Sequence, residues 1–256
     1  QRSRRDDPAA PPVVSGAVVP LWVTVKVPET ARAGTYTGWV RAAAEGVQPF
    51  RIPVEVTVVP WTLPDPHEYR TWVGLMQSPD TLAMEYEATP WSEEHWRLIA
   101  RSMRRLAECG LRVVYVPLLA ESNLGNAESM VRWIRVGKDR FRYDFSRMDR
   151  YLDMAQEYMG EPEIVVFYVW EVSLIPEKGG PKRGGHNRMT RYLKAHDQEL
   201  GSGPLVTMTD RQGKSAETVE LPTYFDPRSK RLWAGLFGEL RRRMSRRGLA
   251  DAMMLG

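Results

Sequence analysis

The stretch Ser92–Leu119, SEEHWRLIARSMRRLAECGLRVVYVPLL, predicts a helix followed closely by a buried strand. Ser92 can cap the helix, the two glutamates after it suit the positive end of the helix dipole, and Gly110 can end the helix. Apolar residues recur at helical spacing: Trp96, Ile99, Met103 and Leu106. Val113–Leu119 is a continuous apolar run, typical of a strand in a parallel sheet. This pairing of helix and strand predicts an α/β fold.

The alternation of strand and helix continues on both sides of this stretch. Apolar runs predict three further strands, at Arg70–Gln77, Ile164–Trp170 and Ala252–Leu255. Two further helices are predicted at Ser146–Met159, opened by a capping-box-like pattern, and at Asp226–Arg247. We expect two excursions, a hairpin at Met130–Tyr143 and a short strand at Leu205–Thr209. Residues 67–256 are therefore predicted to form the N-terminal half of a (β/α)8 TIM-type barrel, with an open parallel sheet as the alternative.

The residues before this region have the pattern of an all-β domain. Three strands are predicted at short spacing: Leu21–Val27, Thr35–Ala43 and Phe50–Val59. Three strands do not close a sandwich, so residues 17–63 are predicted to be the C-terminal part of a β-sandwich domain. Pro60–Pro66 holds three prolines in seven residues and marks the domain boundary. Residues 1–16 are charged and then rich in proline and alanine, as a linker would be.

The composition argues against several kinds of site. The four histidines show no metal-ligand spacing, no cluster of cysteine and histidine occurs, and no glycine fingerprint for a nucleotide follows a strand. We therefore expect neither a metal nor another cofactor. The single cysteine, Cys109, excludes an internal disulfide. No run of residues is long and apolar enough to predict a membrane span.

The arginine-rich stretch Arg228–Arg247 carries much of the net charge of +4. Apolar residues recur through it at helical spacing: Leu232, Trp233, Leu236, Phe237, Leu240 and Met244. The arginines therefore fall largely on the opposite, solvated face of a helix. The alternative is a nucleic-acid-binding helix, which would show a steep salt dependence of binding. We favour the solvated face and expect no nucleic-acid partner.

Candidate binding residues lie at the ends of the predicted strands, because the active site of such a barrel lies at the C-terminal ends of its strands. They are Gln77, Asn123, Trp170 and Glu171. An aromatic ring beside a carboxylate suits a sugar, since the ring covers the apolar face and the carboxylate binds hydroxyls. The alternatives are structural. Trp170 would then pack the barrel rim, Glu171 would pair with a loop cation, and the amides would cap loops.

Several motifs resemble glycoside hydrolase family 123 and its relatives. Leu21–Pro28 and Ala33–Gly38 resemble the last part of the β-sandwich that precedes the catalytic barrel in that family, and Val59–Pro64 is similar to its domain junction. The run from Arg70 through the helix at Ser92 to Tyr168–Glu171 resembles the barrel of less-studied relatives. The resemblance covers nearly the whole chain, and its motifs are turns and strand ends rather than a catalytic signature.

The resemblance implies retaining hydrolysis of β-linked N-acetylgalactosamine, in which the substrate's own acetamido oxygen attacks the anomeric carbon. This route departs from the usual scheme of two carboxylates. The family's acidic pair follows the fourth barrel strand, so we expect it just beyond Gly256, and no catalytic residue is assigned within the chain. The chain by itself is expected to be inactive. Alternatively, the protein binds carbohydrate or serves as a scaffold without catalysis.

The first residue of the chain bears on the setting of the protein. Gln1 is not an initiator methionine, so we expect residues to be missing before it. An exported bacterial enzyme, periplasmic or extracellular, is the expectation.

Overall fold

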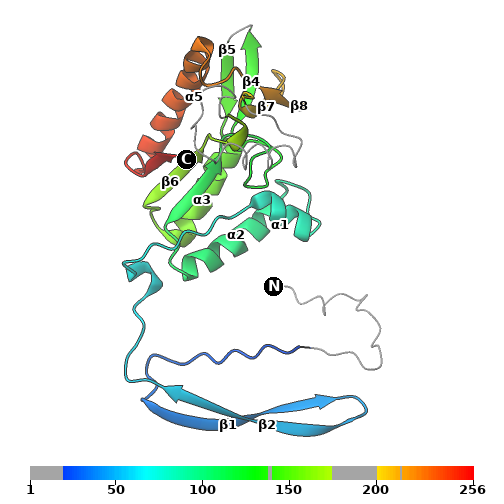
Figure 1. Ribbon diagram of the computed structural model, residues 1–256, viewed down its shortest axis with the longest axis vertical. Coiled ribbons are helices and arrows are strands. Elements are labelled where there is room, and N and C mark those ends of the chain that lie inside the picture. The colour runs from blue at the N-terminus through cyan, green and yellow to red at the C-terminus, as the bar shows by residue number, and fades with distance from the viewer. Residues whose placement is uncertain (1–19, 138–139, 175–200, 214) are drawn as a thin grey trace, which may run out of the picture. The chain divides into compact units, whose positions relative to one another are not determined.

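The computed structural model of the chain describes residues 20–137, 140–174, 201–213 and 215–256. The chain divides into two compact units, Gln1–Leu63 and Pro64–Gly256. The division falls inside the proline-rich stretch Pro60–Pro66. The two units are described separately below, and Figure 1 gives the labels of their elements.

The described part of the first unit is a β-hairpin. Strands β1 (Gly34–Ala44) and β2 (Val47–Val58) pair antiparallel from Gly34 opposite Val58 to Ala44 opposite Val47. Gly46 turns the chain between them with φ +74°, a conformation that glycine adopts without strain. The Arg51 guanidinium lies over the ring of Trp39, 5.1 Å from its centre, which couples the two strands. The second and third predicted strands are therefore present.

The prediction of a strand at Leu21–Val27 is wrong. This segment has no regular secondary structure, and its apolar side chains are exposed, Val23 by 60%. A strand requires a neighbour for its backbone hydrogen bonds, and in the described residues β1 and β2 bond to each other alone. Alternation of apolar and polar residues is not enough where no partner strand lies beside it.

The second unit is built on a parallel sheet of strands β3 (Val113–Pro117), β6 (Ile164–Tyr168) and β9 (Met253–Leu255). Val113 lies opposite Ile164, and Val165 lies opposite Met253. Neighbours in this sheet follow one another in the sequence, an order that fits both the predicted barrel and an open sheet. The three predicted strands at these places are confirmed, each shorter by one or two residues.

The prediction of a strand over Arg70–Gln77 is wrong for all but one residue. Val73 forms a single parallel bridge to Leu111, which precedes β3. Gly74 follows it, and glycine weakens a strand because it offers no side chain to pack. Leu75 and Met76 are 43% and 62% exposed, so burial does not hold them in a sheet.

Three long helices follow the pattern predicted for them. These are α2 (Glu93–Glu108), α3 (Ser146–Met159) and α5 (Pro227–Arg246). The side chain of Ser92 caps α2 by accepting from the backbone N–H of His95 at 3.2 Å. The capping box expected at Ser146 is absent, because the carboxylate of Asp144 accepts the N–H of Ser146 instead, at 2.9 Å.

Some elements were not anticipated from the sequence. Helix α1 (Pro79–Glu85) begins after Ser78, whose hydroxyl accepts from the N–H of Thr81 at 3.3 Å. Short 3-10 helices occupy Pro66–Glu68 and Val172–Leu174. Among the described residues no helix combines the length and the apolarity that crossing a bilayer requires.

The two excursions form one four-stranded sheet. Strands β4 (Arg132–Gly137) and β5 (Arg140–Asp144) make a hairpin between β3 and α3, as predicted. Strands β7 (Leu205–Thr209) and β8 (Ala216–Glu220) make a second hairpin between β6 and α5. Strand β4 pairs in parallel with β7, giving the order β5-β4-β7-β8. Both hairpins follow the C-terminal end of a parallel strand, and Figure 1 shows them together beyond those ends.

The core of the second unit lies between these sheets and the long helices. Its fully buried members come from every large element and include Ile99, Val116, Trp133, Leu152, Phe167, Met208, Leu236 and Leu240. Trp133 on β4 packs edge-on against Trp233 on α5, with ring centres 5.6 Å apart. One continuous core therefore joins the excursion sheet to the helices.

The arginines near the end of α5 hold this helix to α3. Arg243 contacts the carboxylate of Asp149 and lies over the ring of Phe145, 4.4 Å from its centre. Arg247 donates to the carboxylate of Asp149 at 3.2 Å and to its backbone oxygen at 3.0 Å, and it also pairs with Asp153. Part of the basic stretch is thus used in packing two helices together.

Candidate functional site

The C-terminal ends of β3 and β6 lie side by side, because the two strands are parallel neighbours with Pro117 opposite Tyr168. The chain leaving β3 carries Asn123, and the chain leaving β6 carries Glu171. The backbone N–H of Asn123 donates a hydrogen bond of 2.6 Å to the Glu171 carboxylate. Two of the four residues singled out from the sequence are therefore in contact at this edge of the sheet.

Tyr168 is a third member of this group that sequence reasoning missed. Its hydroxyl donates to the side-chain oxygen of Asn123 at 3.0 Å. Burial, together with the negative charge of Glu171, raises the pKa of Tyr168 to about 12, so the phenol stays protonated and remains a donor at neutral pH. Its position as the last residue of β6 is the signal that could have found it.

A buried asparagine shapes the loop that carries Asn123. The amide nitrogen of Asn126 donates to the backbone oxygens of Leu119 at 2.8 Å and Glu128 at 3.0 Å, and its oxygen accepts from the hydroxyl of Ser122. Asn126 is only 4% exposed, so these bonds are shielded from water. Glu121, with φ 53°, turns the chain through the left-handed region just before Ser122.

A hydrogen bond also joins the same loop to helix α1. The carboxylate of Asp80 accepts from the backbone N–H of Ala127 at 2.9 Å. On the other side of the loop, Ser129 and Thr207 exchange hydrogen bonds of 2.8 and 3.0 Å between their backbone N–H groups and hydroxyls. The loop after β3 is thus fixed to α1 and to β7, which places Asn123 firmly against Glu171.

The other two predicted binding residues, Trp170 and Gln77, differ in exposure and in hydrogen bonding. Trp170 is 44% exposed, so its side chain does not fill the core. The amide nitrogen of Gln77 donates to the backbone oxygen of Ile99 on α2 at 3.2 Å, and its oxygen is buried with no partner in the described residues. The structure thus ties Gln77 to α2 instead of to Asn123 and Glu171.

The end of β9 adjoins the same group of residues. The backbone N–H of Val169 donates to the oxygen of Gly256 at 2.8 Å, and the N–H of Gly256 donates to the oxygen of Phe167. The chain therefore leaves β9 at the edge where Trp170 and Glu171 lie. In the residues that the structure describes, no group of three or more histidine, cysteine, aspartate or glutamate residues is arranged to hold a metal.

The family model for the catalytic domain of glycoside hydrolase 123 matches residues 76–256, which include all of the strand ends described above. The chain belongs to glycoside hydrolase family 123. A glycan is accordingly the class of ligand that the family implies.

A solved family 123 structure has a similar fold. It is a glycoside hydrolase from Clostridium perfringens whose description concerns the hydrolysis of glycolipid glycans, and it matches with a TM-score of 0.64 at 16% sequence identity. The match covers 90% of the present chain and 37% of that chain, so the family 123 chain described here spans little more than a third of its relative's length. A comparison with curated proteins found no match.

Proposed function

We propose that this family 123 chain binds a glycan at the carboxyl ends of β3 and β6, with Asn123, Trp170 and Glu171 as the binding residues and Tyr168 beside them. The observation that carries the proposal is the hydrogen-bonded group formed by Asn123, Tyr168 and Glu171 next to a half-exposed indole. Convergent polar groups beside an aromatic face are what a sugar pocket needs. Gln77 is left out of the binding set because its amide donates to α2.

Each residue has a distinct part in this proposal. The Glu171 carboxylate accepts one backbone N–H and has a second oxygen for a sugar hydroxyl, since an ionised carboxylate offers about four acceptor positions. The amide nitrogen of Asn123 can donate while its oxygen accepts from Tyr168. The exposed face of Trp170 would cover the apolar face of a pyranose ring.

The reaction proposed for the whole protein is hydrolysis of a β-linked N-acetylhexosamine, of the N-acetylgalactosamine type, with the substrate's acetamido oxygen as the nucleophile. Membership of family 123 supports this, and the relative from Clostridium perfringens is described as acting on glycolipid glycans. Any residue that follows Gly256 in a longer form would leave β9 beside Val169, close in the chain to Trp170 and Glu171. An acidic pair placed there would face the proposed sugar. We further propose that the protein is exported.

The test is an assay with an aryl β-N-acetylgalactosaminide. We expect no turnover by residues 1–256 and turnover by a longer form that continues past Gly256, in which Glu171→Gln raises KM more than it lowers kcat. Turnover by the 256-residue chain that disappears in Glu171→Gln would make Glu171 catalytic and overturn this assignment. Saturable glycan binding by the longer form without any turnover would instead favour a non-catalytic carbohydrate-binding protein.

A further inference from the structure

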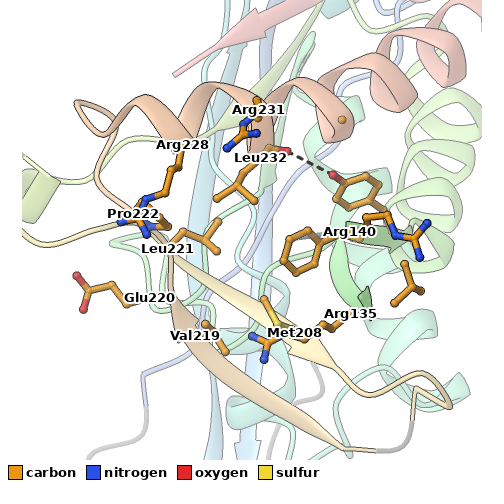
Figure 2. Close-up of a pocket in the computed structure, with 14 residues that line it drawn as sticks. Arg135, Arg140, Met208, Val219, Glu220, Leu221, Pro222, Arg228, Arg231 and Leu232 are labelled. Carbon is orange, nitrogen blue, oxygen red and sulfur yellow. Dashed lines mark hydrogen bonds between the residues drawn. The ribbon is translucent and has the colours of Figure 1, made fainter. Parts of the chain in front are cut away.

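A pocket of about 720 Å³ lies between helix α5 and the excursion sheet. Figure 2 shows it with Arg228 and Arg231 on the helix side and with Arg135, Met208 and Val219 on the strands. Its volume is within the range of small-molecule sites. None of its lining residues belongs to the group of Asn123, Tyr168, Trp170 and Glu171, so this is a second site.

The rim of the pocket carries an excess of positive charge. Four arginines line it, Arg135, Arg140, Arg228 and Arg231, against one carboxylate, that of Glu220. Arg228 pairs with Asp226 at 2.6 Å. Across the described part of the chain no carboxylate lies within ion-pair distance of the other three arginines. The Glu220 carboxylate already accepts the backbone N–H of Gly203 at 2.6 Å.

Helix α5 begins at the rim of the pocket. It begins at Pro227, after its N-cap Asp226, so its N-terminal end lies at the same side of the pocket as Arg228 and Arg231. The carboxylate of Asp226 offsets the partial positive charge of this helix end, because it accepts the backbone N–H of Arg228 at 2.8 Å. Three guanidinium groups at the rim, those of Arg135, Arg140 and Arg231, have no carboxylate partner among the described residues and favour an anion in this pocket.

The floor of the pocket is apolar. Met208 and Leu221 are 2% and 5% exposed, and Phe141 packs edge-on against Trp133 with ring centres 5.4 Å apart. The hydroxyl of Tyr143 donates to the backbone oxygen of Leu232 at 3.3 Å, and burial raises the pKa of Tyr143 to about 12, so the phenol brings no negative charge. An inorganic ion would leave this apolar surface uncovered.

We propose that this pocket binds a small organic anion, a molecule that carries a carboxylate or sulfate on an apolar or ring-shaped body. The guanidinium groups that rim the pocket hold the acidic group, and Phe141 with its neighbours covers the body. This site is independent of the glycan site proposed at the strand ends, because the two share no residue.

The test is isothermal titration of the 256-residue chain with four probes: glucuronate, octyl sulfate, inorganic sulfate and neutral glucose. We expect glucuronate or octyl sulfate to bind saturably and at least tenfold more tightly than inorganic sulfate or glucose, and whichever binds better identifies the body of the ligand. The double substitution Arg135→Gln and Arg231→Gln should weaken that binding at least tenfold.

The matched control removes two charges from the same helix, away from the pocket, by Arg241→Gln with Arg246→Gln. Both control arginines are exposed and lie in no ion pair with a described residue. This control should change the dissociation constant less than twofold, and circular dichroism should show that both double variants are folded. Inorganic sulfate binding as tightly as the organic probes, an equal loss in the two double variants, or no saturable binding by either organic probe would each overturn the proposal.

Discussion

The backbone N–H of Asn123 donates to the carboxylate of Glu171 at 2.6 Å, across 48 residues of sequence. The contact exists because β3 and β6 are parallel neighbours, so the chain leaves both strands at the same edge. The contact therefore links two loops that the sequence alone places far apart.

The ionisation of Glu128 should make the stability of the fold depend on pH. Burial opposes ionisation of this carboxyl, but the hydrogen bonds and charges of Arg147 and Arg132 outweigh it and hold its pKa below the ordinary 4.5. A lowered folded-state pKa gives stability that is fully present above about pH 5 and is lost as the pH falls through the folded pKa. We expect Glu128→Gln to lower the urea midpoint of unfolding at pH 7. The difference in urea midpoint between this variant and the parent chain should be smaller at pH 3 than at pH 7.

The control for this prediction is Glu157→Gln. Glu157 is an exposed residue of α3 that forms no ion pair with any described residue. Its substitution should leave the urea midpoints at both pH values unchanged. If the urea midpoints of Glu128→Gln and the parent chain differ by the same amount at pH 7 and at pH 3, Glu128 does not stabilise the fold through its charge.

The ion pairs between α3 and α5 predict that two aspartates of α3, Asp149 and Asp153, contribute very different amounts to the free energy of unfolding. The side chain of Asp149 is 26% exposed and accepts from both Arg243 and Arg247. Asp149→Ala should therefore cost about 1.5–3 kcal/mol of unfolding free energy, because it leaves two partly buried guanidinium groups without that partner.

Asp153 pairs with Arg247 from an exposed position, with 65% of its side chain accessible. Asp153→Ala should cost less than about 1 kcal/mol, as exposed ion pairs do. Chemical denaturation of the two variants measures both values. Equal costs would mean that α5 is held to α3 by its apolar face alone.

Two glycines of α5 should respond in opposite directions to substitution by alanine. A Cβ added at Gly235 would lie 2.7 Å from the hydroxyl oxygen of Tyr143, whereas one at Gly238 would meet nothing closer than Arg242, at 3.8 Å. Alanine is favoured over glycine in a helix interior by about 1 kcal/mol. Gly238→Ala should therefore raise the melting temperature.

Gly235→Ala should lower it, because Tyr143 is packed against Trp133, with ring centres 5.1 Å apart, and has little room to withdraw. Differential scanning calorimetry of the two variants provides the comparison. A higher melting temperature in both variants would show that Tyr143 can move away from α5 at little cost in free energy.

The helices and buried strands could be predicted from the sequence because their signals are local. The hydroxyl of Ser92, the glycine after α2 and the apolar stripe each act within a few residues, and α3 has the predicted bounds. Leu21–Val27 and Arg70–Gln77 have strand-like patterns, yet a strand depends on a partner that the local pattern does not encode. The pairing of Trp133 with Met208 joins two excursions and is equally invisible to a local pattern.

The sequence could predict those residues of the candidate site that lie at the C-terminal ends of parallel strands. The rule that parallel strands end at one edge is what brought Asn123 and Glu171 under consideration together. The same rule could not show that the amide of Gln77 would turn to Ile99, since that depends on where α2 packs. Nor could it single out Asn126, whose role rests on burial and on three hydrogen bonds within a loop.

The glycan site is tested most directly by comparing two tryptophans of nearly equal exposure. Trp170 is 44% exposed just after the C-terminal end of β6, and Trp72 is 46% exposed next to Val73, which bridges to Leu111 ahead of β3. The measurement is titration of a β-linked N-acetylgalactosaminide into the protein and into its Trp170→Ala and Trp72→Ala variants.

The account predicts that Trp170→Ala weakens binding by tenfold or more, which corresponds to about 1.4 kcal/mol, while unfolding stability changes by less than about 1 kcal/mol. Trp72→Ala should leave the affinity within twofold of the parent protein. Equal affinities in the two variants would contradict the account. So would a loss of about 3–5 kcal/mol in the stability of Trp170→Ala, which is the cost expected for emptying a core aromatic site.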